Sequence, residues 1–153
     1  MNYDFNDTNT KNEALEGYWN QWPWEWFFTA RIKNHHYGLL LKRFRVALQK
    51  DEHLQIAYVG VYVSFPHPHL HILMLGKSKN GKRLAEVDSS HWEKQLQDIT
   101  HNTVIIENIY DQEGVVSYMV RYNMPAHRHE ALVPYNKKLL KRMKVNGLLS
   151  QTH

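Results

Sequence analysis

Two spacings of apolar residues alternate along the chain, and each predicts a different kind of element. Alternating apolar and polar positions, rich in aromatic and β-branched residues, indicate a strand. This pattern predicts four strands, over 24–32, 54–65, 69–76 and 103–110. Apolar residues three and four positions apart indicate a helix with one buried face. That spacing predicts four helices, over 36–50, 91–99, 111–123 and 136–147.

The order of these elements predicts the fold class. Strand, helix, strand, strand, helix, strand, helix is the split βαβ arrangement of ferredoxin-like and RRM-like proteins. We therefore expect an α+β protein with an antiparallel sheet of about four to five strands and helices packed on it. Ser90, with Glu93 three residues later, predicts a capping box for the second helix, and Pro125 stops the third.

The domain organisation follows from composition. The first 18 residues are polar and turn-rich, which predicts a flexible N-terminal tail over 1–18. With no internal repeat or linker, residues 19–153 are expected to form a single domain that ends in a basic C-terminal helix. An apolar fraction of 42% in 153 residues is enough for one packed core. No apolar run is long enough to span a membrane and no signal peptide is evident, so a cytoplasmic protein without membrane contact is expected.

Charge is distributed unevenly along the chain. Residues 1–26 carry a net charge of −4, which leaves +8 on residues 27–153. A basic folded part is typical of nucleic-acid-binding proteins, because neutralised phosphates release counterions. The predicted last helix surrounds its leucines with basic residues, namely Lys137, Lys138, Lys141 and Arg142. It is expected either to follow a DNA backbone or to cover the sheet with a solvated face.

Four tryptophans gather around the first predicted strand, at positions 19, 22, 24 and 26. Exposed rings stack on unpaired bases, which contributes about 1–3 kcal/mol per base. Trp24 and the nearby cation Arg31 are therefore candidate nucleic-acid contacts. The alternative is that some of the tryptophans close the edge of the core.

Three histidines occupy every second position in "FPHPHLHILMLG", at His67, His69 and His71. On an extended chain, residues two apart project to the same face, so His69 and His71 are expected side by side. Neutral imidazole binds divalent transition metals, and the absence of cysteine leaves histidine, carboxylate and amide as ligands. The alternative is a polar sheet face with hydrogen-bonded histidines.

The segment "YMVRY" places Tyr118 and Tyr122 four residues apart on a predicted helix, with Arg121 before the second tyrosine. Residues four apart share a helix face. Taken alone, such a pair is typical of core packing.

Together these motifs resemble the HUH endonucleases, and in particular rolling-circle replication initiators with a two-tyrosine motif. "WFFTARI" resembles the first motif of the family, "PHLHILMLG" the histidine motif and "YMVRY" the tyrosine motif, with arginine where lysine is usual. The resemblance spans residues 24–125, in the expected order. It implies nicking and joining of single-stranded DNA through a covalent 5′-phosphotyrosine intermediate.

The resemblance also implies roles for individual residues. Tyr118 and Tyr122 would be the nucleophiles, Arg121 would neutralise phosphate charge, and His69 and His71 would hold Mn²⁺ or Mg²⁺. The family's usual third ligand, a glutamate on the preceding strand, is missing from "GVYVSF". We expect His67 to replace it, with Asn123 and His127 as alternatives.

The expected partner is single-stranded DNA at an origin or hairpin, with any helicase supplied by a separate protein because the chain has no phosphate-binding glycine loop. A monomer and a dimer are both compatible with the motifs. A transposase-like strand transferase of the same superfamily is a second hypothesis, although such enzymes usually carry one tyrosine. A non-catalytic module that binds single-stranded RNA or DNA is a third, and it would not need His69 and His71.

Overall fold

The sheet has five antiparallel strands in the order β4-β1-β3-β2-β5. The structure is a computed structural model that describes residues 13–33, 37–64, 66–120 and 129–144. The strands are β1 (Trp26–Arg31), β2 (Leu54–Val63), β3 (His69–Ser78), β4 (Glu107–Asn108) and β5 (His129–Ala131). Because β3 lies between β1 and β2, the predicted split βαβ topology and the α+β class are confirmed. The short strand β5, at the β2 edge, was not among the four strands predicted by position.

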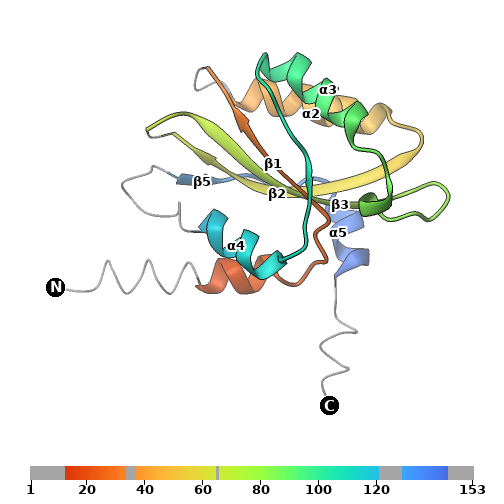
Figure 1. The fold of residues 1–153 in the computed structure, drawn as a ribbon. Helices are drawn as coiled ribbons and strands as arrows, with labels where there is room; N and C mark the ends of the chain where they lie inside the picture. The colour runs from red at the N-terminus through yellow and green to blue at the C-terminus, as the bar shows by residue number, and fades with distance from the viewer. Residues whose placement is uncertain (1–12, 34–36, 65, 121–128, 145–153) are drawn as a thin grey trace.

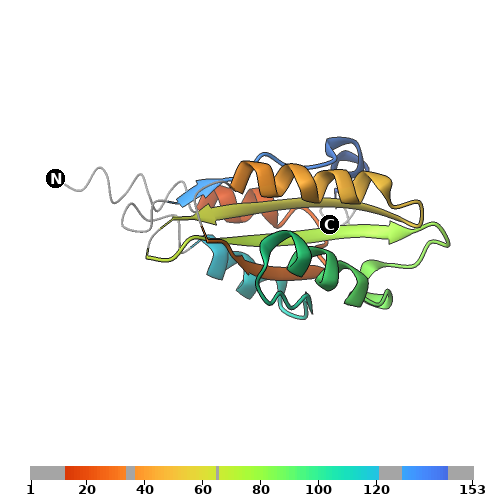
Figure 2. The same ribbon diagram turned by 90° about the horizontal axis from the view of Figure 1, so that it is seen from above.

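Helices cover both faces of the sheet. They are α2 (Tyr37–Lys50), α3 (Ser90–Thr100), α4 (Gln112–Val120) and α5 (Lys137–Met143), with one 3-10 turn, η1 (Leu84–Glu86). Figure 1 shows α2 and α3 over one face, and α4 and α5 on the other. Seen from above in Figure 2, α2 and α3 lie side by side along the strands. Within these described residues, no helix is long and apolar enough to cross a membrane.

The central strand β3 contributes side chains to two separate cores. Leu70, Ile72 and Met74 pack with the apolar residues of α2 and α3. Leu73 and Leu75 pack on the other side with those of α4 and α5. An alternating strand that is buried on both faces is what a central position between two helix layers requires.

The strand predicted over 103–110 is reduced to the two residues of β4. The reason is that Ile106 donates its backbone N–H to the Glu93 carboxylate on α3, at 2.7 Å, instead of to a strand. The same bond explains why the predicted capping box is wrong. Glu93 is engaged elsewhere, and the Ser90 N–H and hydroxyl both donate to the Asp88 carboxylate.

The N-terminal segment differs from the predicted tail over residues 13–18, because 13–19 is helical. Leu15 packs against the α4-side core, and Trp19 is buried in it. This apolar contact explains the order that the polar composition of the segment did not predict.

The tryptophans belong to the core. Trp24 is only 4% exposed, and its Nε1–H donates to the Trp19 carbonyl at 2.7 Å. The Nε1–H of Trp22 likewise donates to the Leu140 carbonyl at 2.7 Å. The prediction that Trp24 contacts nucleic acid is therefore wrong, since its ring is not available to stack on a base.

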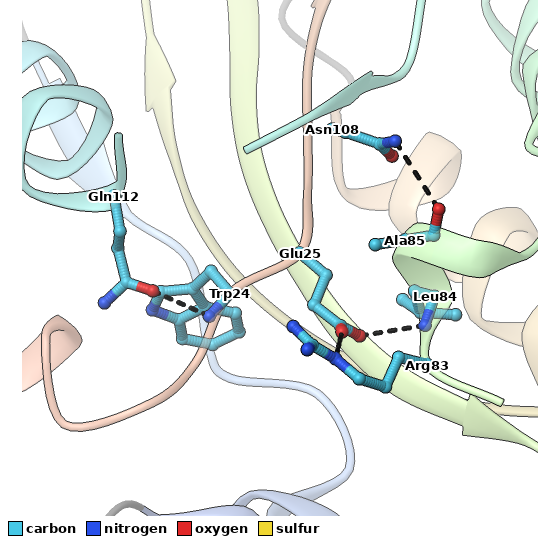
Figure 3. Close-up of polar contacts among 7 residues, drawn as sticks. All are labelled: Trp24, Glu25, Arg83, Leu84, Ala85, Asn108 and Gln112. Carbon is cyan, nitrogen blue, oxygen red and sulfur yellow. Dashed lines mark hydrogen bonds and ion pairs between the residues drawn. The ribbon is translucent and has the colours of Figure 1, made fainter. Parts of the chain in front are cut away.

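A buried carboxylate fixes the entry to β1. Glu25 is 5% exposed and accepts bonds from Arg83 Nε at 2.6 Å and from the Leu84 backbone N–H at 2.9 Å. Figure 3 shows these two bonds converging on one carboxylate. Beside them, the Trp24 backbone N–H donates to the side chain of Gln112, the first residue of α4, at 2.8 Å. The start of β1 is thus bonded to both η1 and α4.

Replacing Glu25 with alanine should lower the free energy of unfolding by about 1–3 kcal/mol, because the buried Leu84 N–H then has no acceptor. Urea denaturation followed by circular dichroism would measure the change. Glu86→Ala is the matched control, since Glu86 is exposed in the same turn; a change within about 0.5 kcal/mol is expected there. Equal effects of the two substitutions would contradict the role assigned to Glu25.

Candidate metal and tyrosine site

His69 and His71 lie at the start of β3, on the face covered by α4. Their Nε2 atoms are 3.1 Å apart and their rings are nearly perpendicular, with centroids 4.7 Å apart. Two nitrogens that bind one ion at about 2.1 Å, with an angle of about 90–110° at the ion, lie about 3.0–3.4 Å apart. The spacing of the pair therefore fits two ligands to one metal ion, and it equally fits a direct hydrogen bond between the two imidazoles.

The other ring nitrogen of each histidine has a defined partner. His69 Nδ1 lies 2.6 Å from the His67 backbone carbonyl, which can only accept, so Nδ1–H donates and the neutral ring has its lone pair on Nε2. His71 Nδ1 lies 2.9 Å from the Thr29 hydroxyl. Such outer bonds orient a ligating imidazole and select its tautomer. Both imidazoles are thereby held in place by bonds at Nδ1.

Two residues of β1 complete the surroundings of His71, and the site predictions had not included them. Thr29 lies directly opposite His71 in the β1–β3 ladder, and the Phe27 ring stacks on the imidazole at 5.9 Å with an interplanar angle of 16°. The alternation in "WFFTARI" was the available signal. Phe27, Thr29 and Arg31 are two apart and therefore share one face.

Tyr118 projects from α4 toward His71. The two ring centroids are 5.4 Å apart at an interplanar angle of 75°, and the tyrosine is 40% exposed. Val116, Met119 and Val120 are buried against the sheet, which leaves Tyr118 at the rim of the helix. The structure therefore places Tyr118 beside the histidine pair, and its role as a nucleophile stays a prediction. Arg121 and Tyr122 lie outside the described residues.

His67 does not complete a metal site in the described part of the chain. No group of three histidine, aspartate or glutamate side chains that could hold an ion occurs there. His67 instead contributes its carbonyl to His69, and its side chain lies in the exposed turn before β3. On β2, the residues opposite His69 and His71 are Val63 and Val61, which carry no ligand atom. The alternatives, Asn123 and His127, lie outside the described residues.

The predicted basic contacts fall into two places. Arg31 is exposed and lies opposite His69 in the ladder, so it belongs to the histidine site. The cations of α5 are exposed on the other side of β2, where Lys137 and Lys138 line a cavity of about 600 Å³ together with Arg45 of α2. None of these three cations pairs with a carboxylate among the described residues. The remaining predicted contacts, Lys141 and Arg142, are exposed on the same helix.

Tyrosines around this cavity show how burial and charge compete. Burial raises the pKa of Tyr135, and the positive charge of Arg45 acts in the opposite direction. The Tyr135 ring stacks on Tyr58 at 5.2 Å. Tyr135 is therefore protonated at neutral pH and lines the cationic cavity, with the buried Tyr58 ring behind it.

Comparisons of the chain with family models, curated proteins and solved structures found no match.

Thr29→Val should weaken metal binding about 10–100-fold, because it removes the hydroxyl bonded to His71 while leaving both imidazoles in place. Titration with Co²⁺, followed by its visible absorption, would measure the affinity. Thr103→Val is the control, since Thr103 is exposed and has no bond to either histidine. Unchanged Co²⁺ affinity in Thr29→Val would show that the Thr29 bond does not orient the ligand.

Proposed function

We propose that this protein is a metal-dependent endonuclease that nicks and rejoins single-stranded DNA, as in the initiation of rolling-circle replication. The observation that supports this most is the meeting of Tyr118 with His71, at 5.4 Å between ring centroids, beside a histidine pair with the spacing of metal ligands. These groups come from segments almost 50 positions apart in the chain. Their convergence is what a tyrosine transesterase needs.

In the proposed reaction, the Tyr118 oxygen attacks the scissile phosphorus and forms a phosphotyrosine ester with the 5′ side of the break. The bond from phosphorus to the 3′ oxygen breaks, and that oxygen takes up a proton to become a free 3′ hydroxyl. The phenolic proton passes to solvent, since Tyr118 lies at the exposed rim. The ester keeps the energy of the broken bond, so the reverse attack by a 3′ hydroxyl rejoins a strand.

The surrounding residues support this chemistry. His69 and His71 would hold a divalent ion, Mn²⁺ or Mg²⁺, which would supply Lewis-acid polarisation of the phosphate. Arg31, opposite His69, adds a fixed positive charge at the edge of the site. In the two-tyrosine mechanism that the motif implies, Arg121 also neutralises phosphate charge and Tyr122 acts second, while the first tyrosine holds a DNA end. That sequence of attacks distinguishes an initiator from a single-tyrosine transposase.

One observation favours a second candidate. The described residues contain only two clustered metal ligands, and a chain without a third would bind metal weakly. Such a protein would act as a non-catalytic single-stranded DNA-binding module on the same face. The two functions differ in whether a covalent adduct forms.

Tyr118→Phe should almost eliminate the covalent protein–DNA adduct, because loss of a positioned nucleophile commonly costs orders of magnitude in rate. The assay is incubation with a diverse single-stranded DNA library and Mn²⁺, followed by a denaturing gel and peptide mapping. Tyr110→Phe is the control, since Tyr110 is 93% exposed and has no contact with the histidines. Tyr122→Phe should retain nicking and impair strand transfer.

Different results of this assay separate the alternatives. An adduct on Tyr122 alone would reverse the order of the two nucleophiles. Adduct formation that survives combined His69→Ala and His71→Ala substitution would remove the metal from the mechanism. The absence of an adduct for every metal and sequence pool would favour the binding module.

Replacing Lys137, Lys138 and Lys141 with glutamine should flatten the salt dependence of single-stranded DNA binding. Each lost phosphate contact reduces the slope of log K against log salt by about 0.7, so a decrease of up to about 2 is expected. Fluorescence anisotropy between low and physiological salt would measure it. The charge-matched control replaces Lys42, Lys79 and Lys94, which are exposed on other elements. Equal slopes of log K against log salt for the two triple variants would indicate that α5 is a solvated surface that does not contact DNA.

A further inference from the structure

A small hollow lies beside the histidine site, along the free side of β1. It has a volume of about 210 Å³ and is lined by Phe27, Phe28 and Thr29 of β1 and by Thr103, Ile105 and Glu107 of the chain leading into β4. No motif in the sequence pointed to it.

The hollow exists because the sheet opens at this edge. β4 pairs with β1 at only two positions, Trp26 and Phe27. The preceding chain is held by side-chain bonds instead, at one end through the Asn102 amide, which donates to the Arg31 carbonyl at 2.9 Å. At the other end, Ile106 N–H donates to Glu93. Between these anchors the chain follows β1 without pairing to it.

The hollow is joined to the candidate catalytic site through two shared residues. Phe27 stacks on His71, Thr29 is hydrogen-bonded to the same imidazole, and both line the hollow. A phosphate placed between Tyr118 and the histidines therefore brings an attached nucleotide to the mouth of the hollow.

The lining suits a nucleobase. Ile105 is 62% exposed and, with Phe27, offers apolar surface to a flat ring. Exposed hydrophobic residues beside a few polar groups are typical of ligand sites. Thr29 and Thr103 add hydroxyls that can donate or accept.

Glu107 gives the hollow its selectivity. Its side chain is exposed and has no hydrogen-bond or ion-pair partner among the described residues. A carboxylate beside a phosphate-binding site repels the DNA backbone, so its favourable partner has to be a donor on a base. Cytosine and adenine present an exocyclic amino group where thymine presents a carbonyl oxygen, and guanine carries its amino group on the neighbouring edge of an unpaired base.

We propose that this hollow binds the base next to the scissile phosphate and that Glu107 selects an amino-bearing base, cytosine, adenine or guanine, over thymine. The proposal rests on the proposed function, since it assumes single-stranded DNA as the ligand. It adds a specificity-determining residue on β4, outside the motifs that carry the family resemblance.

The test measures binding in metal-free buffer, so that it does not depend on cleavage. Fluorescence anisotropy measures the affinity for a fluorescein-labelled oligothymidylate of twelve nucleotides. The same measurement is made on that oligonucleotide with one central cytosine or adenine. The wild-type protein should bind the substituted oligonucleotides about tenfold more tightly, as expected for one good hydrogen-bonded contact to a base. Glu107→Gln should reduce this ratio toward one, and the control Glu86→Gln, exposed on η1, should keep it.

The results of this binding test bear on the hollow alone and do not depend on whether the protein nicks DNA. Equal affinities for the three oligonucleotides in the wild-type protein, or a ratio that Glu107→Gln leaves unchanged, would overturn the assignment of the hollow. Absence of binding to any of them would overturn it too. Failure of the adduct assay alone would remove the nicking function and leave a base-selective binding site.

Discussion

The structure depends on one strand that is buried on both faces. β3 is the middle strand of five, and its side chains from Leu70 to Leu75 are all nearly inaccessible to solvent. Burial on two sides removes a large apolar surface from water, and it also fixes the register. A slip of one residue would exchange the histidines with the leucine and isoleucine that face α2 and α3. The position of the candidate site is therefore set by the same packing that stabilises the fold.

Placing an imidazole in this strand has a cost that its neighbours offset. His71 is 1% exposed, and a polar ring that is buried without partners destabilises a protein by several kcal/mol. Thr29 satisfies one nitrogen and the Nε2 of His69 lies beside the other, while Phe27 and Tyr118 cover the ring with aromatic surface. These contacts restrict the ring to one orientation. A site that must orient a phosphate requires such restriction.

Tyr118, the proposed nucleophile, is brought to this ring by a different set of contacts. α4 presses three apolar residues on the sheet, and its first residue, Gln112, is bonded both to the Trp24 backbone and to the Asn20 side chain. The tryptophans thus serve the site indirectly, because they build the surface on which α4 rests. Sheets of this topology host many unrelated functions, so the fold alone does not indicate which function this protein has. Nicking is proposed because of the residues that meet on this face.

The sequence by itself determined the order of the elements from β1 to α5, apart from the short strand β5, and the common face of His69 and His71, because these depend on local periodicity. The split βαβ topology was then predicted from that order. The tyrosine motif also predicted that Tyr118 is a residue of the site. Only the tertiary structure decided which of the predicted contact residues are exposed. From the sequence, Trp24 could be either a surface contact or a core residue. In the structure it is buried beneath the N-terminal helix, so its ring is not on the surface. Likewise, the bonds that Glu93 and Asn102 make to distant backbone groups shorten β4 and open the hollow beside His71. Such long-range bonds leave no periodic trace in a sequence, because they depend on where two remote segments meet.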